Sequence, residues 1–202
     1  MFENAILPES TMAFVHAVLS REDLPEVCCQ RCGPEFVALA RAQYNKELPV
    51  VMKDLQRKLS IVPIISVHQP LDWDYQICEL VTAQTTTGTS ILSELSASFA
   101  DFFGAQSDVY NRKLRDGENL CKAALRKEAV QMGANAVIGV DIDYAEVGGA
   151  KGMVMVCMSG TAVRLRNPEV VSPDLSQQIQ ELEILWERHR QLTQYVKLAE
   201  VR

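Results

Sequence analysis

The fold is decided by the stretch GANAVIGVDIDY at residues 133–144. It follows a long helical pattern, and Gly133 stands where a left-handed residue is needed to end a helix. The residues after Gly133 alternate strictly, as they do along a strand with two different faces. One face carries Ala136, Ile138, Val140, Ile142 and Tyr144, and the other carries Val137, Gly139, Asp141 and Asp143. We therefore expect a strand with one buried face and one face that presents two carboxylates.

A second strand is predicted just after this stretch, over residues 153–165. The connection between the two strands, VGGAKG at residues 147–152, is rich in glycine and favours an antiparallel hairpin. Both faces of the second strand are mostly apolar or small. Such a strand is expected in the centre of a sheet or under a neighbouring subunit.

The residues before this stretch predict one more strand and two helices. Aromatic and β-branched residues favour a strand over residues 75–87. One helix is expected over residues 90–104 and another over residues 107–132. The order strand–helix–helix–strand–strand is that of an α+β unit. A run at residues 61–67 also has strand character, but Pro63 restricts it to a sheet edge.

Helical patterns flank this unit on both sides. Pro8 can start a first helix, Pro34 starts a second, and Pro49 interrupts the second and starts a third. A last helix is expected over residues 173–198, with an apolar stripe at heptad spacing that turns polar in its second half. The stripe consists of Leu175, Ile179, Leu182, Trp186, His189, Thr193 and Val196. This helix is expected to pack on its own domain or to pair with another copy.

The patterns divide the chain into three parts. We expect a helical N-terminal extension with a cysteine-rich turn over residues 1–60 and an α+β domain over residues 61–168. A C-terminal amphipathic helix completes the chain over residues 169–202.

Composition and charge narrow the class of protein. The chain has 202 residues, 48% of them hydrophobic, and a net charge of −6, which argues against broad binding to nucleic acid or an anionic membrane. It has no apolar run long enough to span a bilayer, and its first residues lack the pattern of a signal peptide. We therefore expect a cytoplasmic protein whose six cysteines are thiols or metal ligands rather than disulfides.

Several short motifs follow one another between residues 75 and 165. They are VTA at residues 81–83, GTSI at residues 88–91, ASFADFFG at residues 97–104, the stretch at residues 133–144 and SGTAV at residues 159–163, together with Tyr110 and Leu114. In this order they resemble the YbjQ-like family, a small domain described as "putative heavy-metal-binding". The resemblance implies a YbjQ-like (dodecin-subunit-like) core that assembles into a ring, typically a pentamer. It implies no established enzymatic activity and does not extend to the terminal helices.

The segment CCQRCG at residues 28–33 has the spacing of a metal or redox motif. Cys29 and Cys32 form a C-x-x-C pair, and Cys28 could supply a third thiolate. A structural zinc ion needs four ligands, and His16 is the nearest histidine in the sequence. The turn could thus hold zinc or another thiophilic metal, have a redox role, or be a structural turn between helices.

Asp141 and Asp143 form the second candidate site. Two residues that share a strand face in this way lie roughly 6.5–7 Å apart. That spacing can line a site for a hard cation such as Mg²⁺ or Ca²⁺, or hold an acid/base pair. The alternative, which we favour, is a polar or interface face that pairs with arginine or lysine side chains.

Three classes of function remain open. We favour a non-enzymatic, homo-oligomeric assembly or scaffold protein with a pentameric ring core and terminal helices that contact a protein partner. The second class is a metal-binding module at the cysteine turn or at Asp141 and Asp143. The third is a small-ligand binder or an enzyme with a site between subunits. The sequence gives no local support for a catalytic triad, because its three histidines lie far apart.

Overall fold

The computed structural model describes residues 6–21, 23–87, 106–147 and 153–200. The chain forms two compact units. Unit 1 consists of residues 1–58 and 180–202, and unit 2 consists of residues 59–179.

Unit 1 is built from helices. Its elements are α1 (Glu9–Leu19), α2 (Gly33–Lys58), the part of α4 (Leu175–Thr193) from Gln180 onward, and α5 (Val196–Glu200). The buried core of the unit contains Phe14, Val15, Val18, Leu24, Ala40, Tyr44, Val51, Leu192 and Ala199. The Phe14 ring packs against the rings of Tyr44 and Tyr195, with centroid distances of 5.9 and 5.7 Å. One apolar core therefore joins the two ends of the chain.

α2 is one continuous helix, so the predicted break at Pro49 is wrong. A proline removes one helical hydrogen bond and costs about 3 kcal/mol in a helix interior. The helix buries Tyr44 before the proline and Val51 and Leu55 after it. Burial stabilises each such side chain by about 1.5–3 kcal/mol. The combined burial on both sides of Pro49 therefore exceeds the cost of the proline.

The C-terminal helix also differs from the prediction. α4 ends at Thr193, whose hydroxyl donates to the carbonyl oxygen of His189 at 2.9 Å, and α5 begins only at Val196. Leu192 is buried, whereas Thr193 is exposed. The apolar stripe leaves the heptad seam in its second half, because Leu192 rather than Thr193 faces the core of unit 1.

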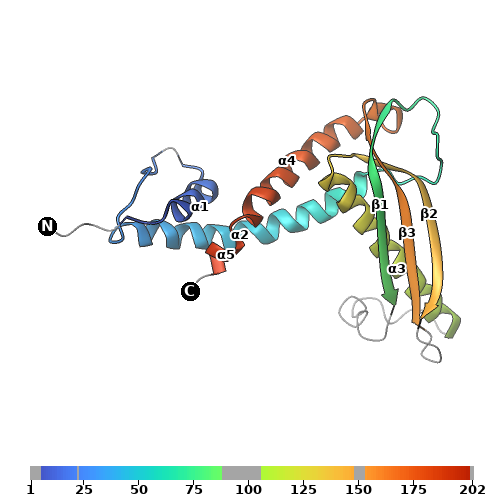
Figure 1. Cartoon of the computed structure of the whole chain (residues 1–202), viewed down its shortest axis with the longest axis horizontal. Coiled ribbons are helices and arrows are strands. Elements are labelled where there is room, and N and C mark those ends of the chain that lie inside the picture. Colours follow the sequence, from blue (N-terminus) through green and yellow to red (C-terminus); the bar gives the residue numbers. More distant parts are fainter. Residues whose placement is uncertain (1–5, 22, 88–105, 148–152, 201–202) are drawn as a thin grey trace. The chain divides into compact units, whose positions relative to one another are not determined.

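Unit 2 contains an antiparallel sheet in the order β1-β3-β2. Its strands are β1 (Tyr75–Thr87), β2 (Ala136–Val147) and β3 (Met153–Leu165). The helix α3 (Gln106–Gln131) runs along one face of this sheet (Figure 1). The α+β class, the antiparallel pairing of β2 with β3 and the central position of β3 are confirmed. The helix expected over residues 90–104 lies outside the described residues.

The main core of unit 2 lies between α3 and the sheet. α3 contributes Cys121, Leu125 and Ala129. The sheet and its approaches contribute Val81, Ala83, Ala134, Val137, Val156, Met158 and Ala162. Gly133 then ends the helical turn with φ = +78°, and its N–H donates to the carbonyl oxygen of Val130 at 3.0 Å. The predicted helix stop at Gly133 is therefore confirmed.

The strict alternation predicted along β2 is wrong, because the strand contains a β-bulge. Between Ile138 and Asp141 the pairing of β2 with β3 shifts by one residue. Gly139 lies in this interval with φ = +59°, a left-handed value that glycine adopts without steric cost. An inserted residue exchanges the two faces of a strand from that point onward.

The bulge gives each half of β2 a different pattern of burial. Val137 before the bulge and Val140 and Ile142 after it pack on the α3 side of the sheet. Ala136 and Ile138 lie in a smaller core on the opposite face. That smaller core also contains Val163, and Ile65, Trp73 and Tyr75 pack against it.

The outer edge of β2 pairs with the backbone of residues 63–67. Val137 N–H donates to the carbonyl oxygen of Pro63 at 2.9 Å, and Ile65 N–H donates to that of Val137 at 3.0 Å. Gly139 N–H donates to the carbonyl oxygen of Val67 at 3.0 Å. The segment with Pro63 thus lies at a sheet edge, as its sequence predicted.

Candidate functional site

The cysteine turn lies directly before α2 in unit 1. Gly33 N–H donates to the carbonyl oxygen of Cys29 at 2.9 Å, and Leu7 N–H donates to that of Cys28 at 2.9 Å. The Cys28 side chain is buried, that of Cys29 is half-buried and that of Cys32 is exposed. The backbone therefore fixes the turn on both sides, and the three thiols differ in their access to solvent.

Cys29 and Cys32 are brought together by this turn. The backbone amides of Cys32 and Arg31 and the thiol of Cys32 hydrogen-bond to the sulfur of Cys29, and these bonds lower the pKa of Cys29. The same contact with Cys29, by hydrogen bonding and by charge, raises the pKa of Cys32. Of the two thiols, Cys29 is therefore the one that ionises first.

A complete zinc site is not assembled at the turn by the described residues. His16 Nε2 lies 3.1 Å from the carbonyl oxygen of Pro25, within hydrogen-bonding distance. Over the described ranges, no group of three or more histidine, cysteine, aspartate or glutamate side chains is placed to hold a metal ion. Zinc at Cys28, Cys29, Cys32 and His16 stays a prediction, since four ligands would have to converge.

The second candidate site is a shallow hollow of about 250 Å³ on the sheet of unit 2. It is lined by Thr82, Ala83, Gln84, Asp141, Asp143, Cys157, Met158 and Ser159. Asp141 pairs with Ser159 and Asp143 pairs with Cys157, so the two carboxylates share one face beside the central strand. Both side chains are exposed. A cation at Asp141 and Asp143 also stays a prediction.

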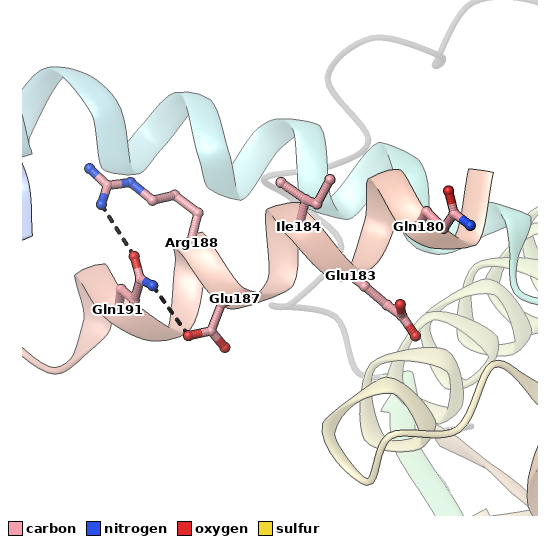
Figure 2. A pocket seen from close by; sticks show the side chains of 6 residues that line it. All are labelled: Gln180, Glu183, Ile184, Glu187, Arg188 and Gln191. Atoms are coloured by element: carbon pink, nitrogen blue, oxygen red, sulfur yellow. Dashed lines mark hydrogen bonds between the residues drawn. The ribbon is translucent and has the colours of Figure 1, made fainter. Parts of the chain in front are cut away.

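A second hollow, of about 600 Å³, lies along α4 in unit 1 (Figure 2). Its lining consists of Gln180, Glu183, Ile184, Glu187, Arg188 and Gln191. The sequence patterns did not single out these residues, because five of the six are polar and occupy the solvent side of the predicted stripe. Ile184 is the apolar exception and is 70% exposed.

Arg188 in this hollow is held by several hydrogen bonds. Its Nε and Nη2 donate to the two carboxylate oxygens of Glu47 at 2.6 and 3.0 Å. Its Nη1 donates to the carbonyl oxygen of Ala17 at 2.8 Å and to Gln191 Oε1 at 3.4 Å. One guanidinium thus connects α1, α2 and α4. Its planar group presents several N–H donors at fixed angles, which suits it to bind several acceptors at once. We interpret Arg188 as a structural residue of unit 1.

The asparagine of the GANAV motif has a structural role that the sequence patterns did not predict. Asn135 is 6% exposed. Its Oδ1 accepts from Leu165 N–H at 2.7 Å, and its Nδ2 donates to the carbonyl oxygen of Leu165 at 3.0 Å. The Asn135 side chain thus replaces a β2 backbone partner for Leu165, the last residue of β3, because β2 begins only at Ala136. A polar residue between two buried alanines was the signal for this role.

The glycine of the SGTAV motif fits the bulge in β2. A Cβ atom at Gly160 would lie 2.7 Å from Val137 Cγ1 and 2.8 Å from Val140 Cγ2. It would also lie 3.3 Å from the carbonyl oxygen of Ile138. Real Cβ atoms essentially never lie within 3.0 Å of other heavy atoms, so glycine on β3 gives the bulge in β2 the room that it needs.

These features define a small α+β domain in which the glycine motifs GANAV and SGTAV help to build the sheet. Residues 73–166 match the family model described as "Putative heavy-metal-binding", which is that of the YbjQ-like family. This part of the chain is similar to the YbjQ-like family, as the resemblance predicted.

A solved structure is similar to part of the chain. It is the crystal structure of a protein of unknown function from Pediococcus pentosaceus ATCC 25745, which belongs to the DUF74 family. The similarity covers 50% of this chain and 95% of that one, with 19% sequence identity and a TM-score of 0.36.

Within the part of the chain that the structure describes, no helix is both long and apolar enough to cross a bilayer.

Proposed function

We propose that this chain is a non-enzymatic assembly protein that forms a homo-oligomer through its YbjQ-like domain. The ring of five copies that the family resemblance implies is the arrangement we favour. The observation that carries the proposal is an exposed apolar pair on β1. Ile77 is 66% exposed and Leu80 is 61% exposed, and both are large aliphatic side chains.

The position of this pair favours a contact between copies. Ile77 pairs with Val163 and Leu80 pairs with Thr161, so both lie on the sheet face opposite α3. Full burial of such a side chain contributes about 1.5–3 kcal/mol. In a closed ring, each copy buries its own Ile77 and Leu80 against a neighbour. This small surface therefore stabilises every contact between subunits.

The edge of β1 favours contact through side chains rather than through an added strand. Leu80 N–H donates to Glu79 Oε1 at 3.0 Å, and Thr82 N–H donates to Glu128 Oε2 at 3.1 Å. Carboxylates therefore occupy two backbone donors that a neighbouring strand would need. Charged groups at an edge are a common protection against uncontrolled strand pairing. The apolar face of β1 remains available for a specific contact.

Unit 1 is the part that we assign to a protein partner. It carries large apolar side chains that are about half exposed or more, namely Leu39, Val50, Met52 and Ile184. We assign these side chains to the contact with that partner, since burial of each would contribute to its binding. The unit would bring that partner to the oligomer.

The hollow beside β2 suits a polar surface next to a contact between copies. Its described lining offers carboxylates, hydroxyls, an amide and a thiol around Asp141 and Asp143, but no imidazole or amine. Both carboxylates are exposed, where water can solvate their charge. An exposed polar face of this kind is typical of the rim of a contact between subunits.

The double variant Ile77→Lys, Leu80→Lys tests the proposed contact. Wild-type protein at micromolar concentration is expected to be an oligomer. The double variant is expected to dissociate at concentrations at least about 100-fold higher, because about 3 kcal/mol or more of apolar burial is lost per copy. Size-exclusion chromatography with light scattering over a dilution series measures this shift.

The matched control is Leu71→Lys, Ile184→Lys. These side chains are 88% and 70% exposed, and the control adds the same charge to the chain. It should keep the mass of the wild type. Equal loss of mass in both double variants would mean that added charge, and not the β1 face, drives dissociation. An unchanged mass in the β1 variant would refute this contact.

A further inference from the structure

The cysteine turn has a geometry that the assembly proposal does not use. Cys29 and Cys32 are separated by two residues in a turn that leads into α2. Gly33 N–H donates to the carbonyl oxygen of Cys29 at 2.9 Å, so one hydrogen-bonded turn holds both cysteines. A C-x-x-C pair in one such turn can close a disulfide without a large backbone movement.

The third thiol of the turn is excluded from this pair by packing. Cys28 is 6% exposed. A Cβ atom built on Gly33 would collide with Leu7 and would lie 3.3 Å from Cys28 Cβ, so Leu7, Cys28 and Gly33 are packed together. Leu7 N–H also binds the carbonyl oxygen of Cys28. Cys28 is therefore part of the packing that supports the turn.

The pair is accessible from solvent. Cys32 is exposed and Cys29 is half-buried, and Gln30 and Arg31 between the two cysteines are exposed. A small molecule can therefore reach the turn without a change in the helices around it. Arg31 offers an exposed guanidinium that can bind a carboxylate of the reagent.

We propose that Cys29 and Cys32 form a dithiol–disulfide exchange site whose reagent is a low-molecular-weight anionic disulfide, such as glutathione disulfide. The Cys29 thiolate attacks one sulfur of the reagent, a mixed disulfide forms, and one thiolate of the reagent leaves. Cys32 then loses its proton and attacks the Cys29 sulfur. The second reagent thiolate leaves, and a Cys29–Cys32 disulfide remains. Two protein thiols are oxidised by two electrons, and one reagent disulfide is reduced to two thiols.

Peptide mapping gives a direct test, because trypsin cuts after Arg31, between the two cysteines. The full-length reduced protein is incubated with glutathione and glutathione disulfide at several ratios, and free thiols are alkylated before digestion. With glutathione disulfide in excess, the peptide that ends at Arg31 should remain linked to the peptide that begins at Cys32. With glutathione in excess, the linked species should be lost.

Three variants assign the roles of the cysteines. Cys32→Ser should accumulate one glutathione on Cys29, since the thiol that displaces it is missing. Cys29→Ser should lose the linked peptide. Cys78→Ser, a half-buried cysteine in unit 2, is the matched control and should retain it. Far-ultraviolet circular dichroism confirms that each variant is folded.

Two results would overturn the exchange site. The first is the absence of the linked peptide at every glutathione ratio. The second is zinc bound in stoichiometric amount to the isolated protein, with Cys29 and Cys32 protected from oxidation until a chelator removes it. The latter result would assign the pair to a metal site instead.

Discussion

Replacing Asn135 with alanine is expected to destabilise unit 2 by about 2–4 kcal/mol. The substitution removes both side-chain hydrogen bonds to the backbone of Leu165. It leaves one buried N–H and one buried carbonyl without a partner, and each such group costs about 1–3 kcal/mol. Asn135 is 6% exposed, so water can replace the lost partners only if the junction of α3 and β2 opens.

The two tryptophans of the chain allow this effect to be measured in unit 2 alone. Trp73 packs against the smaller core of unit 2, and Trp186 belongs to unit 1. Urea denaturation followed by Trp73 fluorescence in a Trp186→Phe background therefore reports on unit 2. A change of less than 0.5 kcal/mol, a rough limit for surface substitutions, would contradict the role given to Asn135.

Asn135→Asp provides a matched control with a pH signature. An ionised aspartate accepts from Leu165 N–H but cannot donate to the carbonyl oxygen of Leu165. Burial raises the pKa of such a carboxyl group above its unfolded value, so the penalty is present above the unfolded pKa. It should diminish as the pH falls through the folded pKa, because a neutral carboxyl group can donate as the amide does. Asn135→Ala should lack this recovery.

Replacing Gly160 with alanine should destabilise unit 2 by about 1–3 kcal/mol, and valine should destabilise it more. The added Cβ atom would overlap the side chains of Val137 and Val140 on both sides of the bulge. These residues are held in the main core beneath α3 and cannot move away without loss of packing. The same fluorescence assay measures the effect.

Gly133→Ala separates crowding from backbone conformation. Gly133 has φ = +78°, and a Cβ atom there would meet nothing within 4 Å. Alanine at this position should therefore cost only the roughly 1–2 kcal/mol of a left-handed conformation. Gly160 does not need a left-handed backbone conformation. The expected loss of stability when it is replaced therefore comes from packing alone. Gly160→Val as stable as the wild type would contradict the close fit between β3 and the bulge.

The sequence predicted the sheet of unit 2 well because its signals are local. The stop at Gly133, the glycine-rich connection after β2 and the two apolar faces of β3 each depend on neighbouring residues. The bulge could not be predicted in the same way. Gly139 was compatible with an uninterrupted strand, and its positive φ accompanies pairing with β3 and with residues 63–67, which are distant in sequence.

The helices of unit 1 show how tertiary packing overrides local signals. Pro49 is a strong helix breaker, yet buried side chains on both sides of it keep α2 continuous. Heptad spacing selected Thr193, whereas the core of unit 1 buries Leu192. Both errors arose because unit 1 joins residues from the two ends of the chain. No pattern within a single helix reveals those contacts.

The sequence identified the residues of the candidate sites but did not predict their positions relative to one another. The C-x-x-C spacing identified Cys29 and Cys32, which the structure does bring together. It did not reveal that Cys28 would be buried or that His16 would face Pro25. Asp141 and Asp143 do share a face of β2. The bulge places that face opposite α3, together with the exposed side chains of β1.

Native mass spectrometry of the untagged wild-type chain tests the central claim most directly. Assembly through the YbjQ-like domain predicts a homo-oligomer at micromolar concentration, with a mass of five chains for the ring that we favour. The Ile77→Lys, Leu80→Lys variant should shift this mass toward a single chain. A wild-type spectrum that contains only single chains of 22.5 kDa at that concentration would contradict the account.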